Sequence, residues 1–128
     1  MKELEKLVLG YLKERDWDQL RPSDMAKSIM IEGAELLELF QWENLPLKDV
    51  RSDPEKLARV KEELADVLIY GLEMSILLGL DTEKIIRQKL AAAAKKYPVS
   101  LVKNREGREP GTEKGYWQLK KKYRTVHK

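Results

Sequence analysis

Two pairs of acidic residues are the feature of this sequence best suited to chemistry. Glu32 and Glu35 are three positions apart, and so are Glu63 and Asp66. On an α-helix, residues with this spacing differ by about 60° around the axis and about 4.5 Å along it, so each pair shares one side. Two such helices lying antiparallel, as a short connection favours, bring four carboxylates to one cleft. Mg²⁺ prefers oxygen ligands and is commonly shared between carboxylates and substrate phosphates, so the pattern predicts a Mg²⁺ site for phosphate chemistry.

The segment around the first pair has two interpretations. The simpler one is an amphipathic helix whose acidic face, with Glu38 on the same side, is solvated. Two details favour a site instead. No Lys or Arg relieves the repulsion among these acids, and Trp42 is predicted on the acidic side, two turns after Glu35. A solvated face has no need of a Trp, whereas a site for metal-bound phosphates and a flat base uses both residue types.

Asp66 is the most informative acid of the second pair. The apolar run Val67–Leu72 follows it directly, and a helix that is apolar nearly all round is predicted to be buried on most faces. A carboxylate entering such a segment is costly unless a metal ion or an ion pair compensates its charge. A salt bridge to Arg59, two turns earlier, is the structural alternative. Glu62 is expected to face solvent, and Glu73 is a possible supporting group behind the site.

Four helical stretches are predicted to position these residues. Apolar spacing, cap-type residues and prolines bound them at about Leu4 to Asp16, Asp24 to Glu43, Pro54 to Leu78 and Thr82 to Lys96. Ser52 and Glu55 have capping-box spacing before the third stretch, and Gly79 is expected to end it. No strand-length alternation of apolar and polar residues occurs. The predicted fold is an all-α four-helix bundle over residues 1–98, followed by a basic tail over residues 99–128.

Composition excludes several classes of protein. A chain of 128 residues is one domain by length, and it has no apolar run long enough to span a membrane. The absence of cysteine and the single His127 argue against thiol chemistry and against zinc. The N-terminal residues carry acids within the first turn and lack the apolar region of a secretory leader, so no leader is expected and a cytoplasmic location is predicted. The third stretch stays apolar from Val67 to Leu80, which predicts an assembly of at least two copies that covers it.

The segment after Pro98 differs in charge from the rest of the chain. From Lys103 onward there are nine Lys and Arg against three Asp and Glu, whereas the whole chain carries +3, so the preceding part is acidic. A loop is predicted around three glycines and a proline, Gly107, Pro110, Gly111 and Gly115. Tyr116 to Tyr123 predicts a short basic helix or a partly ordered arm. This tail is either solvated or closes over a phosphate-bearing ligand or a neighbouring subunit.

A second functional hypothesis rests on this tail alone. It makes the protein a non-catalytic nucleic-acid-binding helical protein, because basic residues interleaved with aromatic ones suit single strands. The residues concerned are Lys120, Lys121, Lys122 and Arg124 with Tyr116, Trp117 and Tyr123. The patch is short and follows an acidic body, so nucleic acid is the less favoured partner. An affinity that falls steeply with salt would identify it.

The acidic motifs stand in a recognisable order. Glu32-Gly33-Ala34-Glu35 is followed about 30 residues later by Glu63-Leu64-Ala65-Asp66. This order resembles the ExxE…ExxD signature of the MazG-like, all-α nucleotide pyrophosphohydrolases, and within them the dCTP pyrophosphatase branch. The resemblance covers about residues 4–98. Its other matching segments are residues 15–19 (RDWDQ), 35–42 (ELLELFQW), 62–70 (EELADVLIY) and 96–98 (KYP).

The resemblance implies roles for individual residues. The implied Mg²⁺ ligands are Glu32, Glu35, Glu63 and Asp66, with Glu38 in a supporting role. The implied substrate contacts are Trp17 and Trp42 beside the base, with Lys89 and Tyr97 at the phosphates. Family members act as dimers or dimers of dimers, with sites completed across subunits. The departures are Ile31 in place of a further Glu of the wider family, Val8 where some branch members have His, and Ala93 where Asn is common.

The expected function is a Mg²⁺-dependent nucleoside triphosphate pyrophosphohydrolase. In the expected reaction, an activated water attacks the α-phosphorus, and a (d)NTP yields a (d)NMP and pyrophosphate. The expected substrate is a pyrimidine deoxynucleotide such as dCTP or a modified form of it. The corresponding role is the removal of surplus or non-standard nucleotides from the pool. A different or broad base preference is the alternative within this class of enzyme.

Overall fold

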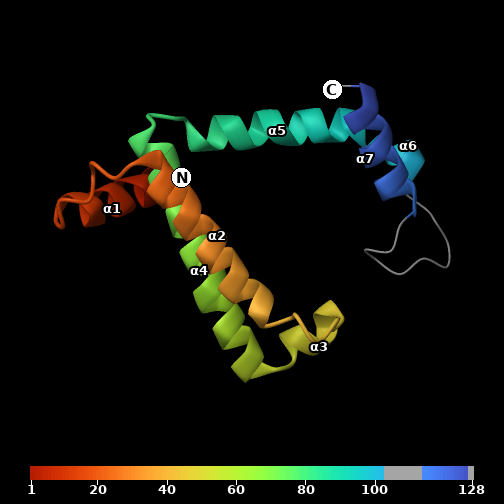
Figure 1. Cartoon of the computed structure of the whole chain (residues 1–128), viewed down its shortest axis with the longest axis horizontal. Coiled ribbons are helices and arrows are strands. Elements are labelled where there is room, and N and C mark those ends of the chain that lie inside the picture. Colours follow the sequence, from red (N-terminus) through yellow and green to blue (C-terminus); the bar gives the residue numbers. More distant parts are fainter. Residues whose placement is uncertain (103–113, 127–128) are drawn as a thin grey trace. The chain divides into compact units, whose positions relative to one another are not determined.

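All regular structure in the described part of the chain is helical. The structure is a computed structural model that describes the backbone of residues 1–102 and 114–126, and the side chains of residues 1–102 and 120–126. Its helices are α1 (Lys2–Lys13), α2 (Pro22–Glu38), α3 (Leu47–Arg51), α4 (Pro54–Leu77), α5 (Thr82–Lys96), α6 (Val99–Val102) and α7 (Lys114–Val126) (Figure 1). The all-α prediction is confirmed. Each of the four predicted stretches overlaps most of one of the long helices α1, α2, α4 and α5.

The chain divides into two compact units, residues 1–82 and residues 83–128. In the first unit, α2 and α4 lie side by side with opposite chain directions, joined through α3 (Figure 1). Helix α1 also contacts α4. The antiparallel arrangement expected for the two acid-bearing helices is therefore present, and it places the middle of α2 beside the middle of α4.

Asp53, and not Ser52, caps the start of α4. The Asp53 carboxylate accepts a hydrogen bond of 3.0 Å from the Lys56 backbone N–H. Pro54 occupies the first turn and disfavours helical geometry in the residue before it, so Asp53 is extended, as a cap residue must be. Ser52 instead donates to the Asp49 carbonyl over 3.2 Å. The capping-box prediction from Ser52 and Glu55 is thus wrong by one position.

Helix α2 ends at Glu38, five residues before the predicted end at Glu43. The residues beyond this end make a tertiary contact, in which the Lys56 ammonium group of α4 pairs with the Glu43 carboxylate. The same ammonium group lies 5.4 Å from the centre of the Phe40 ring. Residues beyond α2 therefore turn towards the start of α4. Trp42 is consequently not on a helical face shared with the acids, which corrects that prediction.

Gly79 ends α4, as the sequence predicted. Gly79 has φ +66°, a left-handed conformation that glycine adopts without steric cost. Its N–H bonds the Ile76 carbonyl at 3.0 Å, and the Leu80 N–H bonds the Ser75 carbonyl at 2.9 Å, which is the Schellman pattern. Ser75 and Thr82 then share a buried side-chain hydrogen bond of 2.7 Å.

The apolar core of the first unit is small. Val8 and Leu12 of α1 pack against Leu72 of α4, with Ile76 and Leu77 beside them. Part of α4 and of the residues just after it remains uncovered in the single chain: Leu68 is 59% exposed and Leu78 is 50% exposed. The expectation that this segment is buried on most faces is therefore not met within one chain. None of the helices in residues 1–102 and 114–126 is long and apolar enough to cross a membrane.

The second unit contains the basic residues of the tail. Helix α6 contacts α7, and the Lys96 ammonium group lies 5.3 Å from the Tyr97 ring centre and 4.4 Å from that of Tyr123. The predicted short basic helix at Tyr116 to Tyr123 is part of α7. Gly115, predicted in a loop, also lies in α7. The predicted loop residues Gly107, Pro110 and Gly111 and the side chains of Tyr116 and Trp117 lie outside the described residues.

Candidate metal centre and adjoining cavity

Three carboxylates from α2 and α4 form one acidic cluster. Carboxylate oxygens of Glu32, Glu63 and Asp66 all lie within 4.8 Å of one another. Glu32 and Glu63 are half-buried and Asp66 is exposed. Glu35, one turn further along α2, is within hydrogen-bonding reach of both Glu32 and Glu63. The structure thus brings together all four acids of the two ExxE and ExxD motifs. Glu38 is exposed a further turn along α2 and is not part of the three-carboxylate group.

The electrostatics of this cluster favour a bound cation. Burial raises the pKa of Glu32 above its usual value, and the negative charges of Glu35 and Asp66 raise it further. Burial likewise raises the pKa of Glu63, again helped by the charge of Glu35. Each acid makes ionisation of its neighbours harder. A proton or a metal ion can relieve this repulsion, and oxygen donors at such spacing suit a hard divalent cation.

Asp66 does not form the salt bridge with Arg59 that was the structural alternative to metal binding. Among the ion pairs of the described residues, none joins Asp66 to Arg59. Two helical turns separate their backbones by about 10 Å, and Arg59 lies instead with Asp53, Glu55 and Lys56 around a depression of about 190 Å³. Asp66 is also exposed rather than buried, so the burial argument for its metal role does not hold. Its place in the acidic cluster supports that role instead.

A cavity of about 720 Å³ adjoins the acidic cluster. Asp66 belongs to both the cluster and the cavity wall. The wall combines residues of α1, the loop after it, α2 and α4: Leu4, Leu7, Val8, Tyr11, Trp17, Leu20, Asp24, Met25, Ser28, Asp66, Ile69, Tyr70 and Glu73. It is mainly apolar, with three aromatic residues, Tyr11, Trp17 and Tyr70, and a few polar groups. This volume and this lining suit a small flat ligand attached to an anionic group at the cluster.

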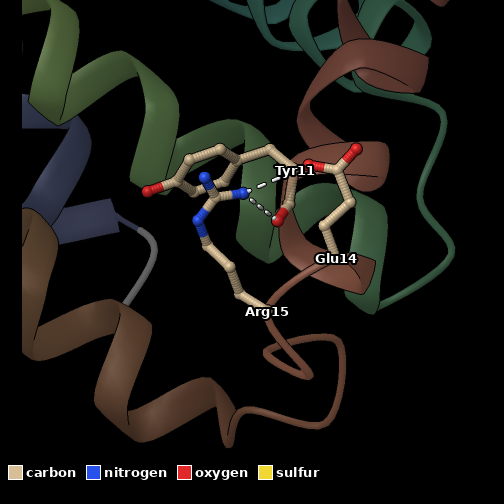
Figure 2. Close-up of polar contacts among 3 residues, drawn as sticks. All are labelled: Tyr11, Glu14 and Arg15. Carbon is tan, nitrogen blue, oxygen red and sulfur yellow. Dashed lines mark hydrogen bonds and ion pairs between the residues drawn. The ribbon is translucent and has the colours of Figure 1, made fainter.

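Arg15 holds the aromatic part of the wall in place (Figure 2). Its guanidinium group donates to the Tyr11 carbonyl over 3.0 Å and lies 3.8 Å from the centre of the Tyr11 ring. Glu14 pairs with the same guanidinium group at 3.4 Å. The Tyr11 ring meets the Trp17 indole edge-on, with centroids 6.0 Å apart. Asp16, with φ 56°, makes the sharp turn that brings Trp17 back towards α1.

Two polar residues of the wall were not predicted as substrate contacts. Burial raises the pKa of Tyr70, and the charges of Glu32 and Glu73 raise it further, while a side-chain hydrogen bond with Ser28 lowers it. Burial raises the pKa of Glu73. The signal in the sequence is their spacing, because Tyr70 and Glu73 follow Asp66 by four and seven residues on one side of α4.

The remaining predicted contacts lie away from this cavity or in the second unit. Trp42 is 88% exposed and belongs to a separate depression formed by residues 40–45. Lys89 is exposed on α5, and Tyr97 is half-buried just beyond it, beside Lys96. Of the positions that depart from the expected pattern, Val8 is buried and lines the cavity, and Ala93 is half-buried on α5.

Comparison with known proteins gives a consistent set of relatives. The sequence model of the MazG-like family matches residues 27–108. The chain is 30% identical to dCTP pyrophosphatase 1 of Rattus norvegicus over 103 residues, which is 79% of this chain and 61% of that protein. It is 28% identical to dCTP pyrophosphatase 1 of Homo sapiens over 106 residues, which is 81% of this chain and 62% of that protein. The chain therefore spans about three fifths of the length of these curated relatives.

A solved structure has a similar fold. It is a pyrophosphatase from Archaeoglobus fulgidus DSM 4304, with a TM-score of 0.67 and 33% sequence identity. The match covers 77% of this chain and 92% of that one. A likeness of this extent and identity agrees with the family match.

Proposed function

This chain belongs to the MazG-like family, and from that membership we propose that it is a nucleoside triphosphate pyrophosphohydrolase. The reaction converts a (d)NTP and water into a (d)NMP and pyrophosphate. The observation that carries the proposal is the acidic cluster of Glu32, Glu63 and Asp66 at the edge of a largely apolar cavity. The cluster suits the phosphate end of a nucleotide through a metal ion, and the cavity suits its base.

The donor set fits Mg²⁺. Its oxygens are close together, it contains no nitrogen or sulfur donor, and its carboxylates repel one another. Glu32, Glu35, Glu63 and Asp66 would hold the ion. When bound, Mg²⁺ supplies charge neutralisation for the phosphates and lowers the pKa of a coordinated water. The carboxylates would fix the place of the ion, and Glu35 would keep Glu32 and Glu63 aligned through its reach to both. Glu38 supports this group from the next turn of α2.

The cavity would hold the base next to Trp17 and Tyr11. We propose a pyrimidine deoxynucleotide such as dCTP as the substrate, because the matched relatives are named for dCTP. Removal of surplus or non-standard nucleotides in the cytoplasm is the corresponding role. Wall residues of α1 and α4 would enclose the ring, and the sugar would lie between the ring and Asp66 at the acidic cluster.

Assembly would complete the site. The uncovered apolar surface of α4, with Leu68 at 59% exposure, supports a homodimer or homotetramer. In that assembly we place Trp42 at the base, and Lys89 and Tyr97 at the phosphates. Residues 1–98 would then form the four-helix catalytic domain, with residues 99–128 as a basic extension. Light scattering after size exclusion tests the assembly, and a monomer at micromolar concentration would contradict it.

A nucleotide screen tests the function. Wild-type protein is incubated with each common (d)NTP, with Mg²⁺ or with EDTA, and pyrophosphate and orthophosphate are measured separately. We expect pyrophosphate, with Mg²⁺ only. Glu63→Gln is expected to abolish its release, whereas Glu62→Gln changes an exposed neighbour on α4 and is expected to leave release nearly unchanged. Orthophosphate as the product, or equal effects of the two variants, would count against the proposal.

A further inference from the structure

Glu73 is a buried acid that faces the cavity without a protein partner. It lies on α4, is 4% exposed, and lines the cavity. None of the hydrogen bonds or ion pairs among the described side chains involves its carboxyl group. Its oxygens are not sealed in the core, because no fully buried polar side-chain atom in the described residues lacks a partner. The carboxyl group therefore keeps its remaining accessible surface at the cavity.

A carboxyl group in this position is costly for folding. Buried polar groups are normally hydrogen-bonded, and burying one without a partner is unfavourable. Its buried neighbour Ser75 follows that rule, since its hydroxyl pairs with Thr82 at 2.7 Å. Leu72, on the other side of Glu73 in sequence, belongs to the apolar core. Glu73 is thus the buried polar side chain of α4 whose hydrogen-bond partner is supplied from the cavity, by water or by a ligand.

The polar groups of the cavity wall indicate which kind of ligand the cavity can hold. Beside Glu73, the polar residues are Asp24, Ser28, Tyr70 and Asp66, and the wall contains no Lys, Arg or His. The charged groups of the wall are thus all carboxylates, which accept hydrogen bonds, whereas its donors are neutral hydroxyl and indole groups. A flat ring that carries an amino group, and so presents N–H donors, matches such a wall better than a ring whose edge carries only carbonyl oxygens beside one N–H.

The position of Glu73 along α4 matches the far end of a nucleotide. Asp66 belongs to the acidic cluster, and Glu73 follows it by seven residues, which is about 10.5 Å along the helix axis. That separation is comparable to the length of a nucleoside monophosphate. A nucleotide with its phosphates at the cluster and its ring in the cavity would extend along α4 towards Glu73.

We propose that Glu73 is the specificity-determining residue of the site, and that its carboxylate accepts a hydrogen bond from the exocyclic amino group of a cytosine-type base. The inference rests on the proposed function and deepens it. A uracil or thymine ring presents a carbonyl oxygen at the same place, and two acceptors facing each other in a desolvated site repel. The site thereby selects amino-bearing over keto-bearing pyrimidine nucleoside triphosphates.

Two matched substrate pairs test this assignment. dCTP and dUTP differ only at the amino-bearing edge of the ring, and so do 5-methyl-dCTP and dTTP. We expect wild type to prefer the amino-bearing member of each pair. Glu73→Leu should lower kcat/KM for that member by about 10- to 100-fold, chiefly through KM, and change the keto member only a few-fold. Glu73→Gln, whose amide can donate as well as accept, should raise the relative use of dUTP and dTTP.

The control is Glu55→Gln, which removes an exposed acid from the first turn of α4, away from the cavity. Thermal melts of all variants identify any loss of folding, and Glu73→Gln keeps the test valid if Glu73→Leu does not fold. Equal losses for both members of each pair, or an unchanged preference in both variants, would overturn the role of Glu73 while leaving the proposed function standing. Wild type that releases no pyrophosphate from any nucleotide would overturn both.

Discussion

Replacing Trp17 with Ala should weaken substrate binding far more than it lowers stability. The indole is 47% exposed in the single chain, and the covered part meets Tyr11 edge-on. If a base covers one face of the exposed part, roughly 50 Å² of indole surface leaves water, which at about 25 cal/mol per Å² contributes about 1 to 1.5 kcal/mol. Base stacking measured by alanine substitution contributes a similar amount, about 1–3 kcal/mol. KM for the preferred nucleotide should therefore rise roughly 5- to 15-fold, with kcat nearly unchanged.

The same substitution has a predictable cost in folding. Losing the edge contact with Tyr11 should remove about 0.5–1.5 kcal/mol, a fall in Tm of a few degrees. Steady-state kinetics with pyrophosphate detection, alongside thermal melts, separate the two effects. Trp17→Phe is the matched control, because it keeps a ring for both contacts and should recover most of the affinity. A variant with a lowered Tm and an unchanged KM would show that Trp17 only packs against Tyr11, and the reasoning about the cavity would be refuted.

Three further predictions concern the acids and the start of α4. Asp66→Asn should fold as well as wild type in EDTA, lose the rise in Tm that Mg²⁺ gives wild type, and turn over several orders of magnitude more slowly; a full Mg²⁺ response would contradict its role as a ligand. In EDTA, the raised pKa values of Glu32 and Glu63 mean that protonation stabilises the fold: this contribution is complete below the unfolded pKa of about 4.5 and is lost as pH rises through the higher folded values. Melts in EDTA should therefore show Tm falling as pH rises through those values, and Mg²⁺ should remove the trend. Asp53→Ala should cost about 1 kcal/mol by removing the helix cap, and Ser52→Ala less; equal losses in denaturant titrations would disprove the assignment of the cap.

The acidic cluster was accessible to prediction because its geometry is local. A spacing of three residues sets which acids share a side of a helix, and the antiparallel pairing of α2 and α4 then brings Glu32 to Glu63 and Asp66. The environment of Asp66 was not accessible in the same way. Its apolar followers predicted burial, but covering them takes more apolar surface than one chain supplies. Which acids bind metal stays a prediction.

The end of α2 and the cavity depend on contacts between residues distant in sequence. The local pattern predicted a helix through Phe40 and Glu43. Both residues instead lie beyond the end of α2 and interact with Lys56 on the next long helix. The incorrect prediction that Trp42 shares a helical face with the acids followed from the predicted helix end at Glu43. The role of Tyr11 in the cavity wall depends on Arg15 above its ring and on the turn at Asp16. No periodicity in the sequence encodes where those side chains meet α4.

Val8 lies both in the apolar core and in the cavity wall, so a substitution there affects stability and base preference together. It is 7% exposed, packs with Leu12 and Leu72 in the core, and also lines the cavity. A bulkier side chain here would reshape the ligand pocket and overpack the core at once, at a typical cost of about 1–3 kcal/mol. Laboratory selection for a new base would therefore meet a stability barrier on the α1 side of the pocket. Leu20, 38% exposed on the loop side of the pocket, is not part of the core and can vary at a smaller cost in stability. We therefore expect changes of base preference to arise more readily on the loop side of the pocket than in α1.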